Sequence, residues 1–232
     1  MRNIRNHLRM ERKGGPAKLA APTPARYASD MASRRLPAED GGLIHIVDAA
    51  LADAARRSGE WLVCRPGCTQ CCVGVFAINQ LDAVRLRKGL ADLEKTDSAR
   101  AARIRERARD SIRRLAPEFP GNAITGVLGE GPKAEDRFEE FANDEVCPVL
   151  DQETGMCDLY GARPMTCRTF GPPVRGEDGL GVCELCFHGA TDEQIAACEM
   201  VADSDDLEDK LVARVEKTEG SRGRTIVTFA VR

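Results

Sequence analysis

Residues 64–72 of this 232-residue chain read CRPGCTQCC and place cysteines at Cys64, Cys68, Cys71 and Cys72. A second, longer segment carries five more, at Cys147, Cys157, Cys167, Cys183 and Cys186. Short cysteine spacings within turns let several sulfurs converge on one point, and Pro66-Gly67 forces such a turn. The two segments are therefore predicted to be irregular loops that fold against each other, with helices as their scaffold.

The clustered cysteines have two chemical interpretations, metal ligands or disulfides. A thiolate is a strong, soft metal ligand. Disulfides persist in oxidising compartments, and residues 1–40 contain no apolar run of the length that a secretory signal needs. We therefore predict metal or cluster ligands in a cytoplasmic protein, with disulfides or inert core thiols as the alternative.

Cysteine spacing leaves the metal and the number of centres open. Zinc accepts four sulfurs tetrahedrally, and an iron–sulfur cluster also takes four thiolates, often three from a local run and one from far away. The neighbours Cys71 and Cys72 point to opposite sides if the segment is extended. Because nine cysteines exceed one four-ligand centre, two centres and one centre with a structural pair are both possible.

Apolar periodicity predicts a mainly α fold with irregular cysteine-rich loops and little β, a small α+β fold being the alternative. Residues 1–40 are rich in Pro, Gly and charge and are expected to form a disordered extension. Residues 41–232 then form one domain with its core at 60–190. Helices are predicted over 43–57, from residue 80 behind an Asn79 N-cap, and over 99–115, 134–142 and 191–217, with a strand over 225–231.

Charge and hydropathy argue against two classes of partner. The net charge is −3, and the basic segment 81–115 has no aromatic side chains on which bases could stack. The chain also lacks a run of about 20 apolar residues that could span a bilayer. We therefore expect neither nucleic acid nor membrane among the partners, and we interpret the basic segment as a solvated helix face.

Four sequence blocks together resemble a known family. They are the cysteine run at 64–72, Cys147-Pro148-Val149-Leu150-Asp151, Cys157-Asp158-Leu159-Tyr160, and the segment from Arg163 to Phe170. This combination is similar to the cysteine-cluster proteins described as zinc- or iron-chelating domains and covers roughly residues 60–190. Family members have Cys-Pro-Phe-Leu, so Val149 is a departure. The resemblance implies metal binding through Cys64, Cys68, Cys71, Cys72, Cys147, Cys157 and Cys167.

Three further features follow from the residues themselves. Cys183 and Cys186 form a Cys-x2-Cys half-site and are added to the ligand set, with His188 as an alternative donor. Cys198 lies in an acidic segment and is interpreted as a small buried residue. Arg163 and Arg168 bracket Cys167, where guanidinium groups can offset thiolate charge and hydrogen-bond to sulfur or to carbonyls.

Metal binding without catalysis is the favoured function, as a carrier, sensor, assembly module or structural site for zinc, iron or an iron–sulfur cluster. An enzyme is the alternative: a flagellin lysine methylase resembles this family, which implies S-adenosylmethionine chemistry, although no Gly-rich strand–helix turn is evident here. A third hypothesis treats the metal as structural and the acidic helix 191–217 as the surface that contacts a protein partner.

Overall fold

The computed structural model describes residues 36–176, 179–203 and 205–232. Most of the predicted N-terminal extension, 1–40, lies outside the described residues. Three long helices carry the domain: α2 (Asp40–Ser58), α3 (Gln80–Thr96) and α4 (Ser98–Leu115). All three were predicted. The N-cap of α3 is confirmed, because the Asn79 side chain accepts the backbone N–H of Asp82 at 2.9 Å.

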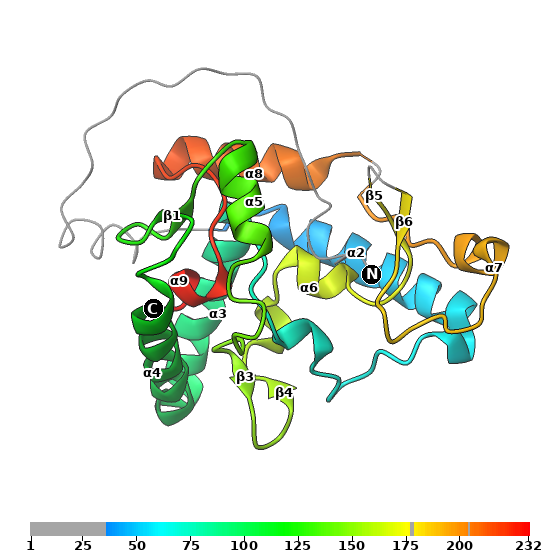
Figure 1. Cartoon of the computed structure of the whole chain (residues 1–232), viewed down its shortest axis with the longest axis horizontal. Coiled ribbons are helices and arrows are strands. Elements are labelled where there is room, and N and C mark those ends of the chain that lie inside the picture. Colours follow the sequence, from blue (N-terminus) through cyan, green and yellow to red (C-terminus); the bar gives the residue numbers. More distant parts are fainter. Residues whose placement is uncertain (1–35, 177–178, 204) are drawn as a thin grey trace.

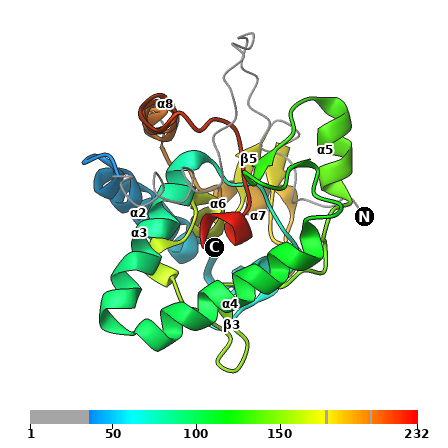
Figure 2. The same ribbon diagram turned by 90° about the vertical axis from the view of Figure 1, so that its left-hand side faces the viewer.

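Apolar residues of these helices form the main cores. One cluster lies between α3, α4 and the C-terminal helix α9 (Val227–Ala230), and it includes Leu86, Ile104 and Val231. A second joins α2 and α3 to α8 (Leu207–Glu219) through residues such as Leu43 and Leu211. Figure 1 and Figure 2 show α9 placed against α3 and α4, and α8 running beside α2. The predicted mainly α fold is confirmed.

The remaining elements are short. Strand β1 (Gly121–Asn122) pairs with β2 (Val127–Leu128), β3 (Leu150–Asp151) with β4 (Met156–Cys157), and β5 (Val174–Gly176) with β6 (Gly179–Gly181), each pair antiparallel. Between them lie α5 (Pro132–Glu139), η5 (Tyr160–Ala162) and α6 (Met165–Thr169), while η3 (Gly59–Trp61) and η4 (Gln70–Cys72) flank the first cysteines. Within the described ranges, no helix is long and apolar enough to cross a bilayer.

The segment predicted as one helix over 191–217 is instead two, α7 (Asp192–Ala197) and α8. Thr191 and Gln194 form the capping box that starts α7. The chain then turns away so that Met200 is buried and donates its N–H to the Pro173 carbonyl at 2.7 Å. Asp203 adopts a left-handed φ of 58° and accepts the N–H groups of Leu207 and Glu208. Part of the acidic run therefore caps a helix.

The predicted strand over 225–231 is also wrong. Thr225 makes one antiparallel bridge with Ile78, and the chain then coils into α9. Residues 225–231 are all buried, and the Phe229 ring packs on Phe119 with centroids 4.8 Å apart. Helical backbone satisfies its own hydrogen bonds inside a closed core, so tertiary burial overrides the β propensity of Val and Ile.

A buried ionic network joins α2, α3 and α6. The Arg85 guanidinium donates to Asp40 at 2.5 Å and also to Asp82. Asp82 in turn accepts the backbone N–H of Met165, the first residue of α6, at 2.9 Å. Burial raises the pKa of Asp82, and the Arg85 charge opposes that rise. The network thus fixes the start of the helix that carries Cys167.

Glu208 lies at the edge of the same network. Its carboxylate accepts the Asn79 side-chain amide at 2.7 Å. Burial and, after it, the negative charge of Asp82 raise the pKa of Glu208 from 4.5 to about 7. Arg85 and the Asn79 amide oppose this rise, and Asp203 adds to it. The folded chain therefore holds this proton to a higher pH than the unfolded chain does.

We expect Glu208→Gln to raise the free energy of unfolding above neutral pH by about 1–2 kcal/mol, allowing for solvent screening. A raised carboxyl pKa makes stability fall as pH rises from 4.5 to about 7, and Gln removes that loss while it still accepts from Asn79. Urea unfolding at about pH 5 and about pH 8 measures the difference. Exposed Glu106→Gln on α4 is the control. An equal effect of Glu208→Gln at both pH values would contradict the prediction.

Candidate metal centre

Backbone hydrogen bonds bring the two cysteine-rich segments together. The Cys147 N–H donates to the Cys72 carbonyl at 2.8 Å, and the Gly74 N–H donates to the Glu145 carbonyl at 2.8 Å. Val73 and Val146 form an antiparallel bridge between these bonds. The first cysteine run is therefore paired edge to edge with the start of the second, as the sequence predicted.

Five thiols form one set, the Cys167 group, which comprises Cys71, Cys72, Cys147, Cys157 and Cys167. Burial raises the pKa of Cys167 well above its usual value, and the thiols of Cys147, Cys71 and Cys157 raise it further. A side-chain hydrogen bond with Cys71 and then burial raise the pKa of Cys72, with added repulsion from Cys147 and Cys167. Each of these five thiols is therefore an electrostatic neighbour of at least one other, although they come from η4, β4, α6 and the loop before β3.

Four thiols form a second set, the Cys183 group, which comprises Cys64, Cys68, Cys183 and Cys186. Cys64 is exposed as a residue, but partial burial of its thiol raises the pKa to about 11, and repulsion from the thiols of Cys68, Cys71, Cys186 and Cys183 adds to the rise. Both pairs lie on tight turns, since the Cys68 N–H donates to the Arg65 carbonyl and the Cys186 N–H to that of Cys183. Gly67 has the φ of 90° that its turn requires.

Two side chains discussed with the cysteines are not assigned to either group. Cys198 is buried and packs with Cys183, Cys186 and Phe187 in an apolar cluster, which agrees with its interpretation as a small core residue. The side chain of His188 is exposed. All nine cysteines that were predicted as ligands thus lie in one of the two groups. Whether they bind metal stays a prediction.

Backbone N–H groups are already directed at several sulfurs. Val149 and Leu150 donate to Cys147, Leu159 donates to Cys157, and Leu185 donates to Cys183. These bonds lower the pKa values of the three thiols, but burial has the larger effect and raises them. The pKa of Cys147 is raised to about 12. Hydrogen bonds to sulfur favour the thiolate, the form that binds metal. The donor set therefore fits zinc or iron, which take sulfur ligands.

The sulfurs are gathered but are not closed around a point. Among the residues that the structure describes, no three His, Cys, Asp or Glu side chains are arranged as a complete metal site. Buried neighbouring thiolates repel one another, and a bound cation would supply the positive charge that draws them together. Closure of the site and metal binding are thus expected to be a single event.

Arginines of α4 hold the hairpin that carries Cys147 and Cys157. Asp158, with a side chain 2% exposed, accepts from Arg100 at 2.5 Å and from Arg107 at 2.6 Å. Arg107 also donates to the Pro148 carbonyl at 2.7 Å. The sequence interpretation of segment 81–115 as a solvated face missed this role. The feature of the sequence that could have indicated this role is Asp158, an acidic residue directly after Cys157 that needs a basic partner.

Arg168 fixes the loop around Cys167 from the other side. Its guanidinium donates to Asp48 at 2.8 Å, to the Gly161 carbonyl at 2.5 Å and to the Arg163 carbonyl at 3.3 Å. The residue is 3% exposed. The expectation of bonds to carbonyls is confirmed for Arg168 and for Arg163, whose guanidinium donates to the Tyr160 carbonyl at 3.0 Å. Arg163 also stacks over the Tyr160 ring at 3.6 Å. Burial raises the pKa of Cys157, and the Leu159 N–H and then the Arg163 charge lower it.

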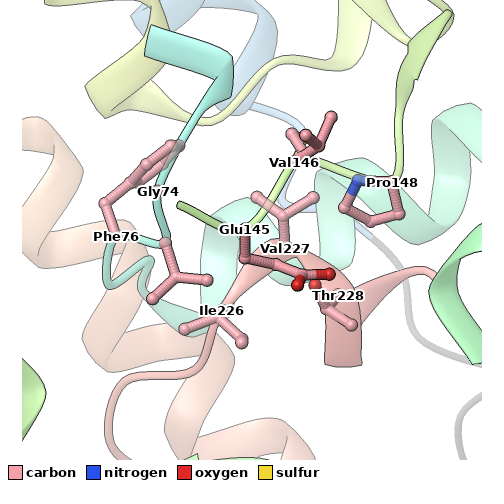
Figure 3. Close-up of a pocket in the computed structure, with 10 residues that line it drawn as sticks. Gly74, Phe76, Glu145, Val146, Pro148, Ile226, Val227 and Thr228 are labelled. Carbon is pink, nitrogen blue, oxygen red and sulfur yellow. The ribbon is translucent and has the colours of Figure 1, made fainter. Parts of the chain in front are cut away.

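A small hollow lies beside Cys147, between segment 74–76, segment 145–148 and the start of α9 (Figure 3). Its labelled walls are mainly apolar, with Phe76, Val146 and Ile226 among them. The carboxylate of Glu145 at its rim pairs with Arg114 at 2.6 Å. Among the described residues, the hollow therefore offers no reactive side chain apart from the neighbouring Cys147 thiol, and the candidate site consists of the thiols.

Comparison with known proteins agrees with this geometry. A family model with the description "Putative zinc- or iron-chelating domain" (CxxCxxCC) matches residues 63–199, well over half of the chain. The matched range contains all nine cysteines of the two groups. No curated protein and no solved structure has a significant match.

We expect Arg168→Lys to lower the free energy of unfolding by about 2–3 kcal/mol. A lysine keeps the charge but cannot donate to Asp48 and to both carbonyls at once, so buried acceptors lose their donors. Urea unfolding under reducing conditions measures the loss, and the exposed Arg103→Lys on α4 should change stability by less than about 0.5 kcal/mol. Equal stability of the two variants would show that Arg168 does not hold the loop.

Proposed function

This chain belongs to the CxxCxxCC family of zinc- or iron-chelating domains, and we propose that its nine clustered cysteines bind the metal as thiolates. One observation carries the assignment of residues: nine thiols from separate elements are grouped as electrostatic neighbours within two loops that are paired by backbone hydrogen bonds. Buried thiols packed this closely need either a proton each or a shared cation.

The proposed role is metal handling or sensing on a helical scaffold. The long helices form the larger part of the apolar clusters, and the cysteine loops pack on these clusters and are held further by arginine contacts and by short antiparallel pairs. Cys64 is exposed, so a metal bound at the Cys183 group has a ligand within reach of solvent and of other thiols. Exchange between thiolates requires such access, which favours handling or sensing over a purely structural site.

An S-adenosylmethionine-dependent, methylase-like enzyme is the alternative. Radical enzymes that use this cofactor are built from repeated parallel strand–helix units. The three sheets within the described residues are antiparallel pairs of two or three residues per strand. This arrangement favours metal binding without radical chemistry.

Elemental analysis and an absorption spectrum of anaerobically purified protein test the proposal. Iron with acid-labile sulfide and a broad band near ~400 nm would identify an iron–sulfur centre. Stoichiometric zinc in a colourless sample would identify zinc thiolates. A reduced, folded chain that holds neither metal would contradict the proposed function.

We expect Cys68→Ser and Cys167→Ser each to lower the metal bound per chain, because a serine hydroxyl is a much poorer ligand for zinc or iron than a thiolate. Each variant should lose at least the metal of the centre to which its cysteine belongs. Elemental analysis of the purified variants measures the loss. Cys198→Ala is the matched control, since it removes a buried thiol of the same loop region and should retain full metal content. Equal loss in all three variants would refute the assignment.

A further inference from the structure

The two thiol groups rest on different apolar clusters. Cys147 and Cys157 pack against the cluster between α3, α4 and α9, together with Val149 and Leu159. Cys183 and Cys186 belong to another cluster with Phe187, on which Trp61, Leu62 and Phe170 pack. Each group therefore has its own hydrophobic support.

Different contacts also hold the two groups to the scaffold. The Cys167 group is fixed through Asp158 and Asp82 to helices α4 and α3. The turn that carries Cys183 and Cys186 lies between β6 and α7, at the end of the molecule away from α4 (Figure 1). Arg57 at the end of α2 holds that end by donating to the carbonyls of Ala197 and Glu199 at 2.6 and 2.9 Å.

Contacts within the Cys183 group connect the two halves of the sequence a second time. The Phe187 N–H donates to the Trp61 carbonyl at 2.9 Å, which places the turn at 183–186 beside the start of the first cysteine run. A Cβ on Gly171 would lie 3.2 Å from the Cβ of Cys64, so the segment after Cys167 passes closely over it. Cys64 and Cys68 are therefore held beside Cys183 and Cys186.

The adjacent pair Cys71-Cys72 marks the division between the groups. It lies on the single turn η4, and the Cys72 carbonyl accepts the Cys147 N–H. Cys71 is an electrostatic neighbour of Cys64 as well as of Cys147, Cys157 and Cys167. Cys72 is therefore placed with the Cys167 group by its backbone pairing, and Cys71 lies between the two groups.

We propose that the chain has two separate metal centres. One is held by Cys64, Cys68, Cys183 and Cys186, and the other by Cys147, Cys157, Cys167 and one thiol of the Cys71-Cys72 pair. Four thiolates complete a zinc or iron–sulfur centre, so the nine cysteines supply two such sets and one extra thiol. This inference rests on the proposed function, and it adds the number of centres and the ligands of each.

The test uses the full chain, reduced and reconstituted anaerobically with Zn²⁺, with excess metal removed. Native mass spectrometry then counts zinc ions per chain in the wild type, in Cys183→Ser/Cys186→Ser and in Cys198→Ala. We expect the double variant to hold half the zinc of the wild type and the Cys198→Ala control to hold all of it. Adding Cys157→Ser to the double variant should remove the remaining zinc.

Circular dichroism on the same samples establishes that the double variant is folded, which is expected because the substituted turn lies away from the α3–α4 core. A folded double variant without zinc would indicate one polynuclear centre and overturn the proposal. Full zinc retention would also overturn it, because Cys183 and Cys186 would then not be ligands. A wild-type chain that binds one zinc refutes two centres but not metal binding, whereas one that binds none refutes the proposed function itself.

Discussion

Mutual repulsion among buried thiolates is the constraint on which the rest of this structure depends. Burial and neighbouring thiols raise the pKa of Cys147 and Cys167, so these thiols are held as neutral groups. Backbone N–H groups directed at sulfur act in the opposite sense and favour the thiolate. A metal cation bound by these thiolates would resolve this opposition, because it would offset their repulsion. Metal binding would then be part of the folding of the loops.

The helices serve this constraint by fixing the loops with charge. Asp82 accepts the first N–H of α6, Arg107 donates to the Pro148 carbonyl, and Arg168 donates to Asp48 of α2 and to two carbonyls of the loop between Cys157 and Cys167. These contacts join the long helices to the segments that carry Cys147 and Cys167. None of these guanidinium groups needs to touch sulfur, so the positive charge positions the backbone while the sulfurs remain available to metal.

Local signals explain what the sequence could predict. The Asn79 cap and the apolar spacing of 99–115 identify α3 and α4 because capping and periodicity act within one element. The same reasoning failed at 191–217 and 225–231, where burial of Met200 and Phe229 against distant segments decides the backbone. Cysteine identity was likewise predictable, whereas the pairing of Arg107 with Asp158 and the division into two thiol groups depend on tertiary contacts.

Division of the thiols follows from the short turn at residues 70–72. An extended segment would direct Cys71 and Cys72 to opposite faces, but η4 is a single 3-10 turn in which the two thiols are hydrogen-bonded to each other. Cys72 therefore lies with Cys147 and Cys167, and Cys71 lies beside it, while Cys64 and Cys68 remain on the preceding turn with Cys183. The short run 64–72 thus contributes thiols to both groups. Separate ligand sets and a shared backbone are thus compatible features of the same nine residues.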